Sequence, residues 1–339
     1  MNNRDIIICR DADELARKAA EDFILLANNS VACDGRFAVA LAGGSTPRSL
    51  YSLLALKKYR REVPWEDTHL FWGDERCVPL DHPDSNYRMV HETLLSKISI
   101  PPENVHRMAG EKEPKLAASE YEAQLKTFFQ LDEGALPRFD LILLGLGQDG
   151  HTASLFPGSE ALNETKRLVA ANFVEKLNAH RLTLTLPVLN NAAIVLFLVA
   201  GASKAAIVKE LLGLKSGTLS YPAAKVQPRG GRLTWLHPSR SSVTDSGVDP
   251  RPVDRRTMAH GGTFMAVKTQ GSPPFREGPT GCRNSPSGHA RRLRVSTESV
   301  VPAPGHVKRQ LAALPSRGPA RPRARRPGGA GRRRCRTRP

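Results

Sequence analysis

The segment FDLILLGLGQDGHTASLFPG, Phe139 to Gly158, decides the fold class, because an apolar run in it ends abruptly in a turn that carries ionisable side chains. Leu141 to Leu144 are continuously apolar, as expected of a strand covered on both faces. Three glycines then allow a sharp turn and a close approach of the backbone to a ligand. Asp149 and His151 lie in this turn. Ligands of open parallel sheets collect at such strand ends, so we expect a site here.

A second glycine turn follows the strand that we expect to end at Leu41. Its residues are Gly43, Gly44, Ser45 and Thr46, followed by a proline that suits the first turn of a helix. We expect Ser45 or Thr46 to cap that helix. Glycines ahead of a helix N-terminus present free backbone N–H groups and the positive end of the helix dipole. The sequence therefore predicts a phosphate site at this turn.

Two further predicted strands also end in charged residues. His69 to Trp72 leads into Asp74, Glu75 and Arg76, and the guanidinium of Arg76 can grip a phosphate or carboxylate with two parallel hydrogen bonds. The alternative there is a surface ion pair among these three residues, which would contribute little. The apolar run 194–199 leads into Lys204 and a helix at 205–212; the alternative for Lys204 is a solvated helix-start residue.

The remaining elements complete an alternation of strands and helices over the first 236 residues, which predicts a single α/β domain. The expected elements are strands at 5–9, 37–41, 182–186 and 233–236 and a helix at 12–27.

The net charge of +17 lies entirely in the last third of the chain. Residues 237–339 hold 22 Lys and Arg against 5 Asp and Glu, whereas residues 1–236 are neutral. The same tail has 14 of the 26 prolines and no Ile, Trp or Tyr. Such a segment cannot bury enough apolar surface to offset its ordering entropy, so we predict a disordered tail rich in Arg, Pro and Gly.

Nothing in the sequence predicts a cofactor, a metal or a membrane span. Gly145, Gly147 and Gly150 match a dinucleotide-binding fingerprint, but Pro157 interrupts the helix that should follow and position 170 is not acidic. The five cysteines show no C-x-x-C spacing typical of zinc sites. The chain has no signal-peptide pattern at its start and no apolar run near the roughly 20 residues of a membrane helix, so we expect a cytoplasmic protein.

Five blocks, in order, resemble the signatures of the 6-phosphogluconolactonase family, and the resemblance covers residues 1–236. The blocks are LAGGSTP (Leu41 to Pro47), GDERCVP with a following SNY (Gly73 to Pro79 and Ser85 to Tyr87), GLGQDGHTASLFPG (Gly145 to Gly158), RLTLTLPVLNNA (Arg181 to Ala192) and AGASKA (Ala200 to Ala205). The resemblance implies the modified doubly wound, Rossmann-like sheet shared with glucosamine-6-phosphate deaminases and ribose-5-phosphate isomerase.

The resemblance also implies the chemistry of the site: hydrolysis of a phosphorylated sugar lactone by a monomer, without cofactor or metal. His151 would be the general base that activates water, and Asp149 and Asp74 would orient it or the substrate hydroxyls. The remaining assignments are phosphate binding by Gly43, Gly44, Ser45 and Thr46, and positive charge from Arg76, Arg181 and Lys204 on the phosphate or the developing oxyanion.

Two alternatives of other classes stay open. An aminosugar-phosphate deaminase also carries G-S-T-P and D-G-H, but it typically has Asp-Glu-Tyr at positions 74–76 and Ile-Ala-Phe-Asn-Glu-Pro after the histidine, unlike this chain. The tail is either out-of-frame sequence from a G/C-rich gene or a polyanion-binding arm. Nine arginines between Arg321 and Arg338 would bind nucleic acid non-specifically and in a salt-dependent way, while the scarcity of aromatics disfavours base recognition.

Overall fold

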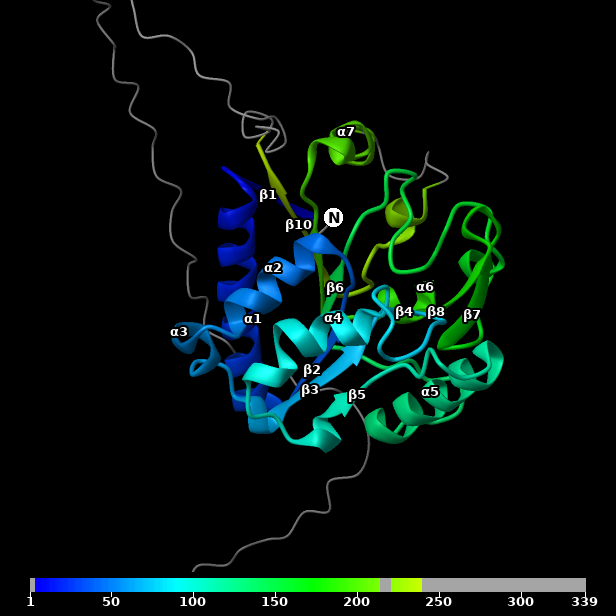
Figure 1. Ribbon diagram of the computed structural model, residues 1–339, viewed down its shortest axis with the longest axis horizontal. Helices are drawn as coiled ribbons and strands as arrows, with labels where there is room; N and C mark the ends of the chain where they lie inside the picture. The colour runs from blue at the N-terminus through cyan, green and yellow to red at the C-terminus, as the bar shows by residue number, and fades with distance from the viewer. Residues whose placement is uncertain (1–3, 214–220, 240–339) are drawn as a thin grey trace, which may run out of the picture. The chain divides into compact units, whose positions relative to one another are not determined.

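The computed structural model describes residues 4–213 and 221–239 of the chain. Its main element is a seven-stranded sheet in which every neighbouring pair is parallel, with the order β1-β10-β9-β6-β2-β3-β5 (Figure 1). The strands are β1 (Arg4–Cys9), β2 (Phe37–Leu41), β3 (Thr68–Trp72), β4 (Asp74–Arg76), β5 (Val105–His106), β6 (Leu141–Leu144), β7 (Val169–Val174), β8 (Ala179–Leu184), β9 (Ile194–Leu198) and β10 (Arg232–Pro238).

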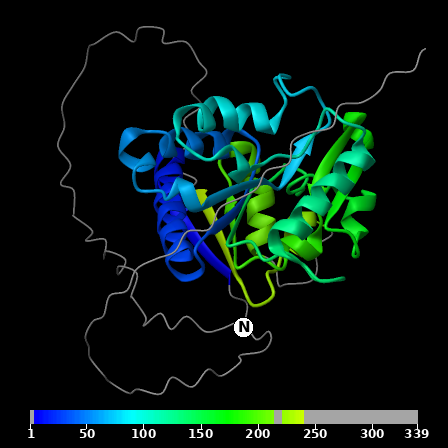
Figure 2. The same cartoon turned by 90° about the horizontal axis from the view of Figure 1, so that it is seen from below.

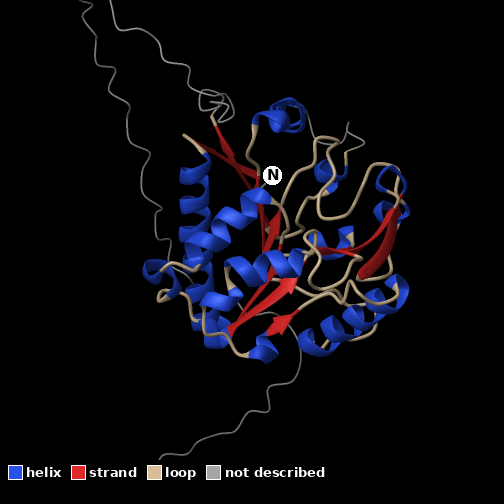
Figure 3. Ribbon diagram, in the orientation of Figure 1, coloured by secondary structure: helices blue, strands red, loops and turns tan. Residues whose placement is uncertain are grey.

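Helices flank the strands of this sheet (Figure 3). They are α1 (Ala12–Asp34), α2 (Ser45–Leu54), α3 (Lys57–Arg60), α4 (Asn86–Thr93), α5 (Pro114–Phe129), α6 (Leu186–Leu189) and α7 (Ala205–Gly213). Seen from below, α1 lies beside β10, and the β7–β8 hairpin lies at the opposite side (Figure 2). Within the described ranges, no helix is long and apolar enough to cross a membrane.

The strand order reverses between β2 and β6, which are hydrogen-bonded neighbours at the centre of the sheet. From β2 the chain proceeds through β3 to β5 at one edge, and from β6 it proceeds through β9 to β10 toward the other. The loops after β2 and β6 therefore diverge and leave a crevice at the carboxyl ends of the strands. This is the predicted doubly wound arrangement, and it places the two glycine-rich turns next to each other.

The central strands are apolar because both of their faces are covered. Every residue of β2 and β6 is buried, as the continuous apolar runs predicted. Asp11 caps the N-terminus of helix α1: its carboxylate accepts a hydrogen bond from the Glu14 backbone N–H at 2.7 Å. Its Phe23 is fully buried and meets Phe37 of β2 edge to face, with ring centroids 5.3 Å apart.

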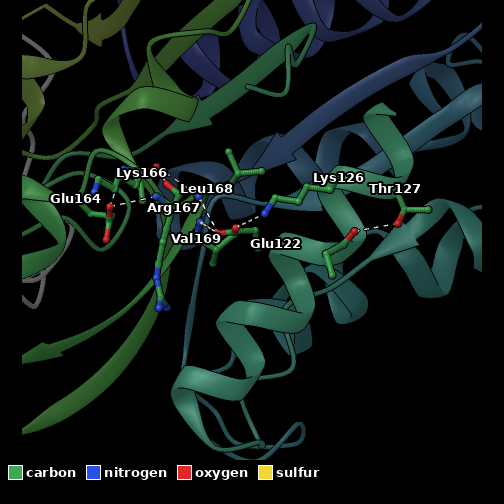
Figure 4. A network of polar contacts seen from close by, with 10 residues as sticks. Glu122, Lys126, Thr127, Glu164, Lys166, Arg167, Leu168 and Val169 are labelled. Atoms are coloured by element: carbon green, nitrogen blue, oxygen red, sulfur yellow. Dashed lines mark hydrogen bonds and ion pairs between the residues drawn. The ribbon is translucent and has the colours of Figure 1, made fainter. Parts of the chain in front are cut away.

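A second, antiparallel sheet of order β4-β8-β7 packs beside α5. On α5, Glu122 accepts hydrogen bonds from the backbone N–H groups of Leu168 and Val169 and pairs with Lys126 (Figure 4). Antiparallel register places Arg76 of β4 directly opposite Arg181 of β8. The small sheet therefore brings two of the predicted cations side by side.

Several boundaries differ from the sequence prediction. Helix α1 continues seven residues beyond Ala27 to Asp34 and is capped by Gly35, which adopts a positive φ of 73°. The strand expected at 182–186 is β8, Ala179–Leu184, because Pro187 near the start of α6 suits a helix rather than a strand. Strand β10 runs to Pro238, two residues past the expected domain end. The predicted disordered tail lies outside the described residues from position 240 on.

Two buried tyrosines fix the strand ends that lead into the crevice. The hydroxyl of Tyr51 accepts a hydrogen bond from the Ala42 N–H at 3.0 Å and donates one to the Ala42 carbonyl at 2.8 Å. Tyr121 likewise accepts from the Trp72 N–H at 2.9 Å. Both tyrosines are almost fully buried, so each hydroxyl replaces the water that these backbone groups would otherwise need.

We predict that Tyr51→Phe lowers the free energy of unfolding by about 1–3 kcal/mol, because it leaves the buried Ala42 N–H and carbonyl unpaired. Urea unfolding checks the prediction. Tyr59→Phe is the matched control: Tyr59 is also buried, but its hydroxyl bonds to no residue in the described part of the chain, and we expect a change within about 0.5 kcal/mol. Equal losses in both variants would contradict the role of Tyr51.

Candidate active site

A cavity of about 220 Å³ opens at the carboxyl ends of β2, β3, β6 and β9. It is several times the roughly 30 Å³ that a water molecule occupies in the liquid, so it can admit a small organic molecule. Eight of the ten residues predicted from the sequence line it: Gly43, Gly44, Ser45, Thr46, Asp74, Arg76, His151 and Lys204. Asp149 and Arg181 are not part of this lining: Asp149 contacts His151, and Arg181 lies opposite Arg76 in the small sheet.

The glycine turn, Gly43 to Thr46, opens α2. Gly44 is the N-cap residue, with a φ of 100° that favours glycine. The expectation that Ser45 or Thr46 caps the helix is therefore wrong: both are in the first helical turn, and no side chain caps α2. The backbone N–H groups of that first turn have no partner within the helix. They face the cavity with the positive end of the helix dipole, which suits an anion.

Asn86 joins the glycine turn to Asp74. Gly43 lies so close to the amide of Asn86 that a β-carbon at position 43 would collide with it. The same amide donates to the backbone carbonyl of Asp74 at 2.9 Å and to its carboxylate at 3.3 Å, and Ser154 donates to the other carboxylate oxygen at 2.7 Å. Asn86 and Ser154 lie inside two of the family-like blocks, but neither residue was predicted as part of the site, because contact between distant segments is not visible in sequence.

Glu75 is a structural carboxylate rather than part of a surface ion pair. It is 2% exposed and accepts hydrogen bonds from the backbone N–H groups of Arg76, Asn86 and Tyr87 at 2.7–2.8 Å. Burial raises the pKa of Glu75 to about 7, and these hydrogen bonds counteract part of that rise. Because Glu75 is bound to the start of α4 and Arg76 donates instead to the Asp84 carbonyl at 2.6 Å, the ion-pair alternative is wrong.

The histidine turn, Gly145 to His151, fixes the imidazole. Asp149 Oδ1 lies 2.5 Å from His151 Nδ1 and 3.2 Å from its backbone nitrogen. A carboxylate can only accept hydrogen bonds, so the ring proton resides on Nδ1 and the lone pair on Nε2. Two glycines permit this geometry: a β-carbon at Gly147 would collide with the His151 ring, and Gly150 has a φ of 76°.

The surroundings keep the imidazole neutral. Burial is the main reason that the pKa of His151 falls from its ordinary value of 6.5 to about 4. Lys204, Arg76 and Arg181 lower it further, while Asp74 opposes them. Burial also lowers the pKa of the Lys204 ammonium, which makes no hydrogen bond or ion pair with residues 4–213 and 221–239. The site therefore combines a neutral base with a cation available to a ligand.

No group of three His, Cys, Asp or Glu side chains that could hold a metal ion occurs within the ranges that the structure describes. The groups that the cavity offers to a ligand include the His151 imidazole, the Asp74 carboxylate, the cations and the backbone N–H groups of the glycine turn.

Comparison with known proteins agrees with this arrangement. Residues 10–235 match the family of glucosamine-6-phosphate isomerases and 6-phosphogluconolactonases. The chain is 47% identical over 208 residues to a 6-phosphogluconolactonase of Synechocystis sp., a match that covers 61% of this chain and 84% of that protein. The crystal structure of 6-phosphogluconolactonase from Thermotoga maritima superposes with a TM-score of 0.60 at 30% identity, covering 70% of this chain and all of that one.

A monomeric glucosamine-6-phosphate deaminase superposes with a TM-score of 0.59 over 70% of this chain and 98% of that one, but at 19% identity it shows the fold alone. Fold and cavity together define a doubly wound α/β protein with a crevice at the switch point of its sheet, into which a glycine turn and a helix N-terminus face. The chain belongs to the family of glucosamine-6-phosphate isomerases and 6-phosphogluconolactonases.

We predict that the His151 ring in the free protein stays neutral well below pH 6.5, because burial and the nearby cations disfavour its protonated form. NMR titration of 15N-labelled histidine measures this directly. Stability should follow the same sign: an unfolded His151 gains its proton near pH 6.5 and the folded one near pH 4, so unfolding becomes easier as the pH falls through that window. A His151 pKa at or above 6.5 would contradict the proposed electrostatics.

Proposed function

We propose that this protein hydrolyses 6-phospho-D-glucono-1,5-lactone to 6-phospho-D-gluconate, a step of the oxidative pentose phosphate pathway, in the cytoplasm. The supporting observation is the His151 imidazole, held by Asp149 with its basic nitrogen free, in a cavity that also contains an anion-binding turn. The name of the Synechocystis relative supports the same substrate. Family membership does not itself choose between lactone and aminosugar substrates.

The reaction follows from the groups present. His151 Nε2 takes a proton from water as the water oxygen attacks the lactone carbonyl carbon. The carbonyl oxygen becomes an oxyanion, stabilised by Arg76 of the cavity lining, and Arg181 adds positive charge from the neighbouring strand. When the intermediate collapses, the bond from the carbonyl carbon to the ring oxygen breaks, and the imidazolium returns the proton to that oxygen. The product is an open-chain acid, which ionises in water.

The residues that line the cavity indicate how the substrate would be oriented. Gly43, Gly44, Ser45 and Thr46 would receive the phosphate together with Lys204, whose ammonium lines the cavity without a protein partner in the described ranges. Asp74, fixed by Asn86 and Ser154, would accept hydrogen bonds from the sugar hydroxyls or help to orient His151.

We predict that His151→Ala lowers kcat for lactone hydrolysis by about 10²- to 10⁴-fold with little change in KM, because it removes proton transfer but no phosphate contact. The assay uses freshly generated lactone and subtracts the spontaneous rate. Glucosamine 6-phosphate serves as the second substrate: ammonia release from it, without lactone hydrolysis, would move the assignment to the deaminase class.

Lys204→Met should separate phosphate binding from the chemical step. We expect kcat/KM for the phosphorylated lactone to fall about tenfold or more, because a charge-assisted hydrogen bond contributes roughly 1.5–3 kcal/mol. The unphosphorylated glucono-1,5-lactone should be hydrolysed as slowly by the variant as by the wild type. Equal losses on both lactones would assign Lys204 to the oxyanion instead.

Polyanion binding by the tail can be tested separately from the lactonase activity. Polyanion binding through residues 237–339 predicts RNA affinity that collapses as salt rises and disappears on deletion of those residues. Affinity that survives the deletion would exclude the arm.

A further inference from the structure

The loop of the β7–β8 hairpin contacts the histidine turn through the side chain of Lys176. This residue lies in the short 3₁₀ segment Glu175–Leu177 that connects the two strands. Its ammonium forms an ion pair with Asp149 Oδ2 and lies 4.9 Å from the centroid of the Phe156 ring. The Phe156 ring in turn stacks on the His151 imidazole, with centroids 4.2 Å apart and an interplanar angle of 25°. Four side chains from two distant segments thus form one group.

Each oxygen of the Asp149 carboxylate has a separate partner. Oδ1 faces the ring nitrogen and the backbone N–H of His151, and Oδ2 faces Lys176. Asp149 lies in a glycine-rich turn and is 29% exposed, so without a partner on Oδ2 its carboxylate can rotate toward solvent. The second partner removes that freedom.

The ion pair between Lys176 and Asp149 contributes little to the stability of the folded protein. The Lys176 side chain is 53% exposed, and ion pairs between exposed side chains contribute little to folding because water and salt screen them. We expect Lys176 to act instead on the orientation of the Asp149 carboxylate. Displacements of about 1 Å near reacting atoms can change rates by about 100-fold.

We propose that Lys176 is a positioning residue: it holds Asp149 so that the proton of His151 stays on Nδ1 and the Nε2 lone pair points into the cavity. The Phe156 ring stacks on the imidazole and also contacts the Lys176 ammonium, so it restricts the orientation of both side chains. This inference rests on the proposed role of His151 as the general base.

The first test compares Lys176→Met with Lys176→Arg in the full chain. We expect Lys176→Met to lower kcat about two- to fivefold with KM unchanged, because an exposed ion pair biases the orientation of the carboxylate by no more than this and no substrate contact is lost. Lys176→Arg restores most of kcat, since a guanidinium also binds a carboxylate. Lys115→Met is the matched control: it removes one positive charge from an exposed position on α5, outside the cavity lining, and should leave kcat unchanged.

A double-mutant cycle tests whether Lys176 affects kcat through Asp149. In an Asp149→Asn background, Lys176→Met should cause no further loss, because the group that it positions is already gone. If Lys176→Met instead lowers kcat by the same factor in both backgrounds, the proposal is overturned. It is also overturned if Lys176→Met has wild-type kcat.

A spectroscopic readout separates this inference from the proposed function. The Nδ1–H proton of His151 should give a downfield NMR signal in the free wild-type protein and in Lys176→Arg, and that signal should broaden or vanish in Lys176→Met. The signal needs no substrate. A wild-type chain without lactonase activity would overturn the proposed function, whereas an unchanged signal in Lys176→Met would overturn the positioning role alone.

Discussion

The pairing of β2 with β6 is the constraint on which the rest of the molecule depends. Parallel pairing aligns the carboxyl ends of the two strands, and the reversal of strand order between them sends their following loops apart. Residues of the glycine turn and of the histidine turn consequently line the same crevice. About a hundred residues separate them along the chain, so no local interaction could have brought an anion site and an imidazole together.

Burial then sets the chemistry of this crevice. Donors hold the carboxylates at and beside it: Glu75 accepts from three backbone N–H groups, and Asp74 accepts from Asn86 and Ser154. The cations are less completely paired, and together with burial they disfavour a protonated His151. A neutral imidazole beside unneutralised positive charge is suited to taking a proton from water while an anion develops nearby. The same charges that would bind a phosphate thus also keep the base in its active form.

The sequence predicted those parts of this arrangement that depend on local patterns. The apolar runs of β2 and β6 and the glycine turns after them indicated a parallel sheet with a ligand crevice, and the structure confirms that fold. The cap of α2 was predicted wrongly, since a glycine with positive φ replaced the side-chain cap. Asn86 and Lys176 carried no local signal, because their partners Gly43 and Asp149 are distant in the chain and contact them only through the tertiary fold.

The most direct test of the account is the rate at which the purified full-length protein hydrolyses freshly generated 6-phosphogluconolactone at neutral pH, measured against spontaneous hydrolysis. The account predicts rapid conversion to 6-phosphogluconate with one oxygen from solvent water in the new carboxylate, visible by mass spectrometry in 18O-labelled water. A folded protein that leaves the spontaneous rate unchanged would contradict it.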